Sequence, residues 1–251
     1  MTSADRTATA PGNGLTILKL SIWRGAEEGR FEEFEIPAED RMTVLDAVTI
    51  VQRKLDPSLS YRFACRVGVC GSCAMMVNGT PRWTCRTHVS KVVRDGQITL
   101  APLRSLPVIK DLATDMSTFF EKNEKAGGRF VPSREGHRDI VSVDPKSRQR
   151  KRADAAIECI GCGVCYASCD VVAWNKDYLG PAALNRAWSL VNDERDGDKA
   201  GHLKKVAVDA GCHACHSHQA CANNCPQMLN PTASIAGLKR EIFAAALKGE
   251  L

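Results

Sequence analysis

The sequence predicts an α+β protein whose first half is rich in strands and whose second half is helical. Residues 15–36 largely alternate apolar and polar side chains, which is typical of half-buried strands. Residues 182–193 and 232–247 instead follow a proline suited to a first helical turn. Eleven of the twelve cysteines form two groups, one in each half. We therefore expect two domains, each built around its own cysteines.

The first half has the element order of a β-grasp fold. Residues 15–24 and 30–36 are expected to form a hairpin. A helix is expected from Thr43, whose hydroxyl can cap the first turn, and a last strand is expected at 98–100.

A second hairpin is predicted around Asn78 and Gly79. Both residues of such a two-residue turn take positive φ, and Asn-Gly does so readily. The flanking strands should carry Cys85 back beside Cys73, as a site of four thiolates requires.

The middle of the chain is expected to connect the two halves. Residues 111–125 fit an amphipathic helix, and residues 127–152 are rich in Gly, Pro, Arg and Lys, as a surface connection would be. Five positive charges fall within residues 146–152. We interpret this run as a solvated linker, with contact to an anionic lipid or an acidic partner as the alternative.

The first cysteine group has the plant-type ferredoxin spacing for a 2Fe-2S centre, C-x4-C-x2-C with a fourth cysteine further on. Small residues between the ligands let the backbone wrap closely around sulfide. Structural zinc in an interaction module without a redox role is the rival interpretation, since zinc takes four tetrahedral ligands. The expected cluster ligands are Cys65, Cys70, Cys73 and Cys85.

The second group has the spacing of a two-cluster bacterial ferredoxin, in which the last cysteine of each run serves the other cluster. The expected ligands of a 4Fe-4S cluster are Cys159, Cys162, Cys165 and Cys225. Those of a third centre are Cys169, Cys215 and Cys221. Three thiolates suffice for a 3Fe-4S cluster, whereas Cys212 or His218 could complete a 4Fe-4S cluster instead.

The predicted fold class is thus an N-terminal β-grasp 2Fe-2S ferredoxin domain followed by an α-helical bacterial-ferredoxin-like domain that holds two clusters. The expected segments are a disordered N-terminus (1–14), the plant-type ferredoxin domain (15–107), a helix and linker (108–152) and the helical 4Fe-4S/3Fe-4S domain (153–251).

Composition narrows the classes of function. Twelve cysteines without an apolar leader segment point to a reducing compartment and argue against disulfides. No stretch approaches about 18 consecutive apolar residues, so no membrane-spanning helix is expected. The 34 basic and 29 acidic residues interleave, which leaves no broad cationic field for nucleic acid. No glycine-rich nucleotide loop is present, so we expect electron transfer without hydride chemistry on this chain.

The chain resembles the iron-sulfur subunit of the succinate dehydrogenase and fumarate reductase family from about residue 15 to about residue 248. The segments that carry the resemblance are SYRFACRVGVCGSCAMMVNG (60–79), PLRSLPVIKDLATDM (102–116), ECIGCGVCYASC (158–169), YLGPAALNRAW (178–188) and CHSHQACANNCPQMLNPTASI (215–235).

This resemblance implies a subunit that carries electrons singly through 2Fe-2S, 4Fe-4S and 3Fe-4S clusters. It implies a FAD-containing flavoprotein partner that holds the succinate site, with quinone as the acceptor; a quinol:fumarate reductase is the alternative. It further implies one or more membrane anchor subunits, with haem b in the anchor left open. The expected location is peripheral, on the cytoplasmic face of the bacterial inner membrane.

The resemblance also places Trp174, His216 and His218 at the quinone site. An indole N–H or an imidazole is a suitable donor or proton relay there. The family keeps a non-cysteine at the His218 position, which favours a three-iron centre. The chain departs from the family at Asp170, where proline is common, and at Ala173, where a second tryptophan often stands.

Overall fold

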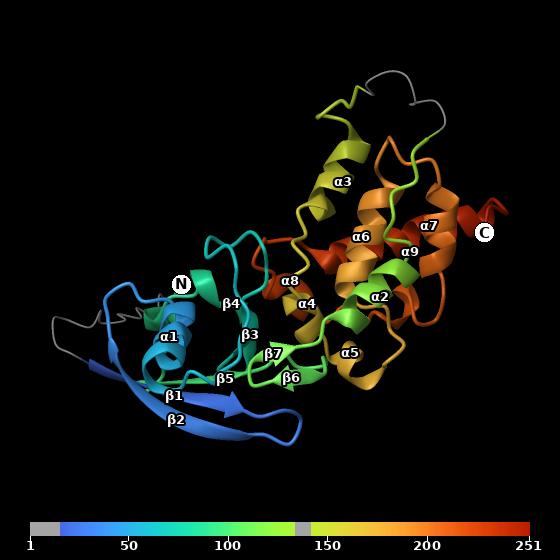
Figure 1. Ribbon diagram of the computed structural model, residues 1–251. Helices are drawn as coiled ribbons and strands as arrows, with labels where there is room; N and C mark the ends of the chain where they lie inside the picture. Colours follow the sequence, from blue (N-terminus) through green and yellow to red (C-terminus); the bar gives the residue numbers. More distant parts are fainter. Residues whose placement is uncertain (1–15, 134–141) are drawn as a thin grey trace, which may run out of the picture.

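A five-stranded mixed sheet forms the first part of the molecule in the computed structural model, which describes residues 16–133 and 142–251 (Figure 1). The strands are β1 (Thr16–Arg24), β2 (Arg30–Ala38), β3 (Ala74–Val77), β4 (Thr80–Trp83) and β5 (Gln97–Ala101). Their order is β2-β1-β5-β3-β4, with β1 and β5 parallel and the other pairs antiparallel. Both predicted hairpins are confirmed. The expected disordered N-terminus, residues 1–14, lies outside the described residues.

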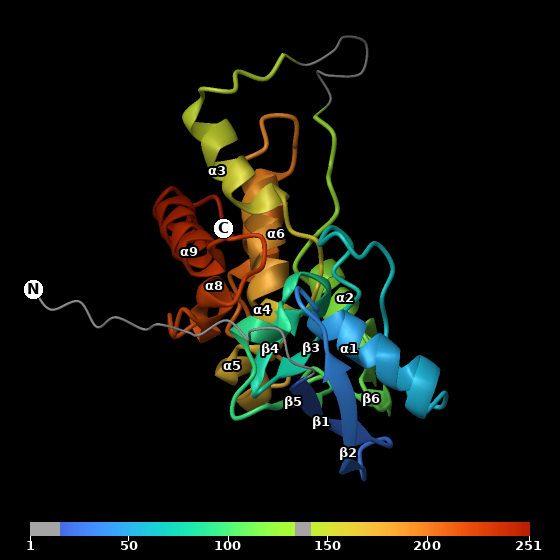
Figure 2. The ribbon, with the colours of Figure 1, turned by 90° about the vertical axis from the view of Figure 1, so that its left-hand side faces the viewer.

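Helix α1 (Val44–Ile50) packs on this sheet and continues into a π-helical turn, Val51–Leu55 (Figure 2). Thr43 caps the helix as predicted: its hydroxyl accepts the N–H of Asp46, and the Asp46 carboxylate accepts the N–H of Thr43. The apolar face of α1 meets Leu20 and Ile98, which are fully buried. This packing closes the β-grasp core beside the first cysteine loop.

The Asn78-Gly79 turn is fastened to the neighbouring strand. Asn78 has φ +49° and Gly79 has φ +76°, as the predicted turn requires. The Asn78 amide donates to the carbonyl of Val92 at 2.6 Å and accepts the N–H of Thr99 at 2.8 Å. Two short 3-10 helices follow, at Thr84–Arg86 and Val89–Lys91.

The helix predicted over 111–125 is only half correct. The observed elements are β6 (Val108–Lys110), β7 (Ala113–Thr114) and α2 (Ser117–Lys125). Asp111 is buried with φ +54°, and its carboxylate accepts the N–H groups of Gly25 and Ser60, each at 2.8 Å. These long-range bonds hold the chain in a turn, so the helix begins only after them.

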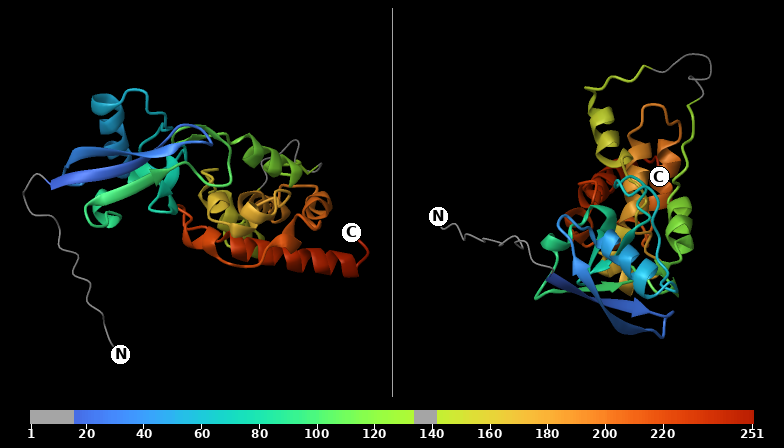
Figure 3. Two further views of the ribbon diagram at one scale, coloured as in Figure 1. Left: turned by 90° about the horizontal axis from the view of Figure 1, so that it is seen from below. Right: turned by 60° about the vertical axis from the view of Figure 1, so that its left-hand side comes forward.

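Helices make up the second part, as predicted. They are α3 (Arg148–Ile157), α4 (Val164–Ala167), α5 (Asp170–Trp174), α6 (Pro181–Val191), α7 (Lys199–Val206), α8 (Ala220–Asn223) and α9 (Pro231–Leu247), with a 3-10 turn at Cys212–Ala214. Helix α6 is almost entirely buried and packs against α3, α7 and α9. Helix α9 extends along this part to the C-terminus (Figure 3). The predicted proline starts at Pro181 and Pro231 are confirmed.

The basic run at 146–152 is helical from Arg148 onward, so it is not a linker there, although Lys146, Arg148 and Lys151 are exposed as predicted. The guanidinium of Arg152 lies 5.7 Å from the ring centroid of Trp188 in α6 and 3.2 Å from a carboxylate oxygen of Glu241 in α9. Arginine can bury its stem along apolar surface and keep its charge paired, which suits it to this helix interface.

No helix within residues 16–133 and 142–251 is both long and apolar enough to cross a membrane.

Candidate iron-sulfur sites

The first site consists of Cys65, Cys70, Cys73 and Cys85, which lie together beside α1. The backbone N–H of Val69 donates to the Cys65 sulfur at 3.3 Å, and the N–H of Cys85 donates to the Cys73 sulfur at 3.5 Å. Cys73 and Cys85 are buried, whereas Cys65 and Cys70 are partly exposed. The site therefore has a buried inner edge and an outer edge near solvent.

Electrostatics differ across this first site. Hydrogen bonds from the backbone N–H groups of Val69 and Val67 lower the pKa of Cys65 to about 6. Burial, followed by the neighbouring Cys73 thiol, raises the pKa of Cys85 to about 12. Cys65 is thus a thiolate at neutral pH, whereas Cys85 needs a bound cation to lose its proton.

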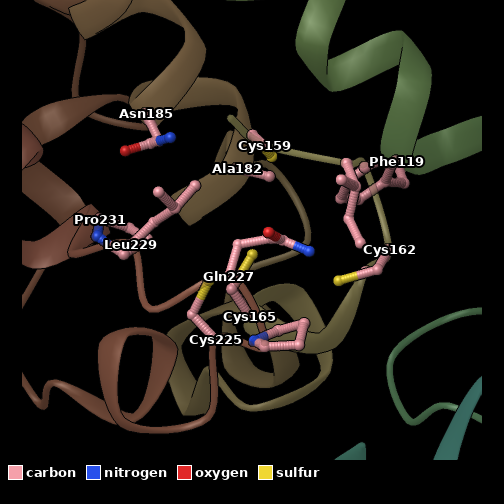
Figure 4. A pocket seen from close by; sticks show the side chains of 14 residues that line it. Phe119, Cys159, Cys162, Cys165, Ala182, Asn185, Cys225, Gln227, Leu229 and Pro231 are labelled. Atoms are coloured by element: carbon pink, nitrogen blue, oxygen red, sulfur yellow. The ribbon is translucent and has the colours of Figure 1, made fainter. Parts of the chain in front are cut away.

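The second site consists of Cys159, Cys162, Cys165 and Cys225, which line one cavity (Figure 4). Phe119 from α2 and Gln227 also line it. The loop after α8 brings Cys225 back to the run at 159–165. The structure therefore brings together the four cysteines that the sequence spacing assigns to one cluster. Burial raises the pKa of Cys162 to about 12, and burial also raises the pKa of Cys165 well above its usual value.

The third site consists of Cys169, Cys215 and Cys221, which line another cavity with Tyr178 and His218. Burial raises the pKa values of Cys169 and Cys221. Cys212 is fully buried within the apolar core of the helical part and does not line this cavity. Of the two residues that could complete a four-iron cluster, only His218 faces the third site.

The donor set fits iron-sulfur clusters. All twelve cysteines are free thiols, and eleven of them surround the three sites. Within the described ranges, no three His, Cys, Asp or Glu side chains converge closely enough to hold a single metal ion. In a 3Fe-4S or 4Fe-4S cluster each thiolate binds its own iron atom, and in a 2Fe-2S cluster two thiolates bind each iron. Ligands spaced around a cavity are therefore the arrangement required.

The first and second sites touch. Gly71, inside the first cysteine loop, has φ +72°, and a Cβ at this position would lie 2.7 Å from the Cβ of Cys162 and 2.8 Å from its Cα. The Gln227 amide donates to the carbonyl of Gly68 at 3.1 Å. A cavity lined by Cys70, Gly71 and Cys162 lies at this junction. The sequence offered no signal for these contacts, because they join residues that are far apart in the chain.

The second and third sites share helix α4. Cys165 lies within it, and Cys169 follows its end. Arg104, from the end of the sheet part, donates to the carbonyl of Ser168 at 3.0 Å and pairs with Asp170 at 2.8 Å. Asp170, which stands where the family commonly has proline, is therefore a partner for Arg104. This contact ties the sheet part to the segment that carries Cys169.

Trp174, His216 and His218 meet at the outer side of the third site. The centroid of the His218 ring lies 6.3 Å from that of the Trp174 ring and 6.1 Å from that of the His216 ring. The Trp174 side chain is 73% exposed. The structure thus places these three predicted residues side by side, next to the third site and open to solvent.

Comparisons with known proteins agree with this two-part arrangement. The family described as "2Fe-2S iron-sulfur cluster binding domain" matches residues 15–121, and the "4Fe-4S dicluster domain" matches residues 155–229.

The chain is similar both to fumarate reductase iron-sulfur subunits and to succinate dehydrogenase iron-sulfur subunits. It is 32% identical over 220 residues to the fumarate reductase iron-sulfur subunit of Haemophilus influenzae, covering 83% of this chain and 85% of the relative. It is 33% identical over 244 residues to the succinate dehydrogenase iron-sulfur subunit of Paracoccus denitrificans, covering 93% and 91%. A solved chain of the Mycobacterium smegmatis Sdh1 complex superposes with a TM-score of 0.83 at 27% identity, covering 94% of this chain and 98% of that one.

Proposed function

The chain belongs to the iron-sulfur subunits of the succinate dehydrogenase and fumarate reductase family, and we propose that it conducts electrons from a FAD-containing flavoprotein to a membrane quinone. The observation that carries this proposal is the contiguous series of three cysteine sites. The first touches the second through Gly71 and Cys162, and the second meets the third along α4. The dicarboxylate chemistry belongs to the flavoprotein.

The proposed ligands are those expected from the spacing. A 2Fe-2S cluster is assigned to the first site, a 4Fe-4S cluster to the second and a 3Fe-4S cluster to the third. When bound, such clusters accept and release single electrons at potentials set partly by hydrogen bonds to their sulfurs. This chain supplies the thiolates, the Val69 N–H that bonds Cys65 and the largely apolar lining of the second site.

Iron content and EPR of the complex, purified without oxygen, test the assignment. We expect about nine iron atoms per chain, with separate signals for three clusters. Iron near or below about four per chain, in a fully reconstituted sample, would contradict three clusters.

The third centre is proposed to contain three irons, because only three cysteines line its cavity and Cys212 lies apart in the core. A near-isotropic EPR signal should appear in the air-oxidised complex and should survive Cys212→Ala. Absence of that signal from active complex would mean that a fourth iron is bound, and His218→Ala would then show whether the imidazole holds it.

Quinone is proposed to bind beside Trp174, His216 and His218, where the membrane anchor would approach. Trp174→Ala should reduce quinone-coupled turnover far more than electron transfer to an artificial acceptor that draws electrons upstream. Trp174→Phe keeps an aromatic ring but removes the indole N–H together with the second ring. An equal loss in both assays would argue against a quinone role.

Succinate oxidation is the proposed physiological direction, with fumarate reduction as the alternative. Relatives of both kinds match the chain at nearly the same identity. Turnover of the purified complex, measured with succinate and ubiquinone and then with fumarate and menaquinol, separates the two directions.

The proposed position of the chain is peripheral, on the cytoplasmic face of the bacterial inner membrane, where an anchor subunit holds it. Spectroscopy of the same preparation would report the haem content of that anchor.

A further inference from the structure

Lys122 is a buried cation to which the proposed electron path assigns no role. It lies in the last turn of α2, and its side chain is only 6% exposed. Its ammonium donates to the hydroxyl of Tyr166 at 3.0 Å and lies 5.2 Å from the centroid of that ring. None of the ion pairs formed within residues 16–133 and 142–251 includes Lys122.

Tyr166 holds this contact between the second and third sites. It stands in α4, next to Cys165 and three residues before Cys169. The Phe119 ring meets it edge-on at 5.7 Å, and a Cβ at Gly180 would lie 3.0 Å from the ring. The tyrosine hydroxyl is the hydrogen-bond partner of the ammonium, and no carboxylate pairs with Lys122 among the described residues. The ring is packed from several sides and keeps Lys122 in place.

A buried ammonium whose hydrogen-bond acceptor is neutral is costly. Removing a charge from water without a counter-charge is unfavourable, and buried lysines are rarely retained unless they are paired. Burial accordingly lowers the pKa of Lys122, and the opposing carboxylate of Asp177 has a smaller influence. Thiolate-ligated iron-sulfur clusters bring negative charge into the same interior, and Cys169, a proposed ligand of the third cluster, donates its backbone N–H to the carbonyl of Tyr166 at 3.2 Å.

We infer that Lys122 is the buried counter-charge of the third cluster and raises its reduction potential. The inference rests on the proposed ligands of the third site. Reduction adds one electron, and therefore one negative charge, to the cluster. A fixed ammonium nearby stabilises the reduced form more than the oxidised form, and a low-dielectric interior screens this attraction less than water would. An electron arriving from the second site is then favoured to move on to the third.

Lys122→Gln in the assembled complex tests this charge, because glutamine can still donate to the Tyr166 hydroxyl. The measurement is a mediated potentiometric titration that follows the EPR signal of each cluster. We expect the reduced-to-oxidised ratio of the third centre at a fixed potential to fall about tenfold, a shift of about 59 mV for one electron. The second centre should shift less, and the first should not shift.

Lys125→Gln is the matched control, since Lys125 lies on the same helix and is exposed. It should leave all three potentials unchanged. Lys122→Met, with a stem of similar length that suits an apolar site, repeats the test if the glutamine variant assembles poorly. An unchanged third-centre potential in either assembled variant overturns the inference and leaves the proposed function intact. An equal shift in Lys125→Gln also overturns it, whereas a wild-type complex without a third cluster signal overturns the ligand assignment itself.

Discussion

The first cysteine site and the two in the helical part achieve the same kind of ligand set by different routes. All ligands of the first site lie within residues 65–85, on one loop and on the 3-10 turn that follows the next hairpin. The second site combines residues 159–165 with Cys225, and the third combines Cys169 with two residues beyond 214. A local loop can form its site with little help. The interleaved sites exist only after the helices have packed.

Cysteines of the two regions also differ in thiol pKa. Backbone N–H groups lower the pKa of Cys65 to about 6, whereas burial raises that of Cys162 to about 12. The first site thus presents an anion at neutral pH before any metal arrives. Cys85 in the first site and Cys162 in the second both keep their protons until iron displaces them, so Cys65 is the thiol that sets the first site apart.

Loss of a ligand should affect the two regions to different extents. Cys225→Ser is expected to abolish turnover and to remove both the second and the third cluster signals, because the two sites share α4 and one core. Cys85→Ser should remove only the 2Fe-2S signal and leave the helical clusters in place. Iron analysis and EPR measure both. Loss of the three-iron signal in Cys85→Ser would show that the two parts do not assemble independently.

Thiol reactivity in the absence of any cluster compares the outer and inner edges of the first site. In the iron-free protein, the alkylation rate of Cys65 should be half-maximal near pH 6, whereas Cys85 should stay unreactive until the pH approaches 12. Because the pKa of Cys65 is lowered in the folded state, its thiolate stabilises the fold above its unfolded pKa, and this contribution disappears as the pH falls through about 6. Mass spectrometry of trapped protein reports both cysteines. Equal reactivity of the two would contradict the contrast.

The contact between the two regions is tested by adding one methyl group. Gly71→Ala should cost about 1–3 kcal/mol of unfolding free energy, since it combines positive φ with a clash against Cys162. It should also slow electron transfer from the first cluster to the second by pushing the two loops apart. Gly79→Ala is the control, because Gly79 has φ +76° but nothing within 4 Å of its added Cβ. Thermal unfolding and the magnetic interaction between the reduced clusters should separate the two variants.

The smallest expected effect is at the hydrogen bond that joins the same two loops. Gln227→Ala removes the donor to the Gly68 carbonyl, which should cost about 0.5–1.5 kcal/mol. All three clusters should still assemble, since Gln227 is not a ligand. Denaturant unfolding of the complex measures the loss. A change larger than that of Gly71→Ala would mean that the amide, rather than the glycine contact, holds the two parts together.

Sequence reasoning failed where long-range contacts compete with local pattern. Residues 111–116 have a helical pattern, yet the buried Asp111 carboxylate holds them in a turn by bonding Gly25 and Ser60. The basic run at 146–152 looks like a solvated linker, yet Arg152 lies over Trp188 and pairs with Glu241. In both cases the deciding partner lies at least 36 residues away along the chain.

The sequence by itself determined the two-part fold, the two hairpins, the helix starts at Thr43, Pro181 and Pro231, and the grouping of the cysteines. These features depend on spacing and on turn and cap chemistry, which neighbouring residues express locally. Only the tertiary structure decided that Gly71 meets Cys162, that Cys212 lies in the core and that Lys122 is buried against Tyr166. Those facts depend on which surfaces meet when the sheet and the helices pack, and a linear pattern does not encode that.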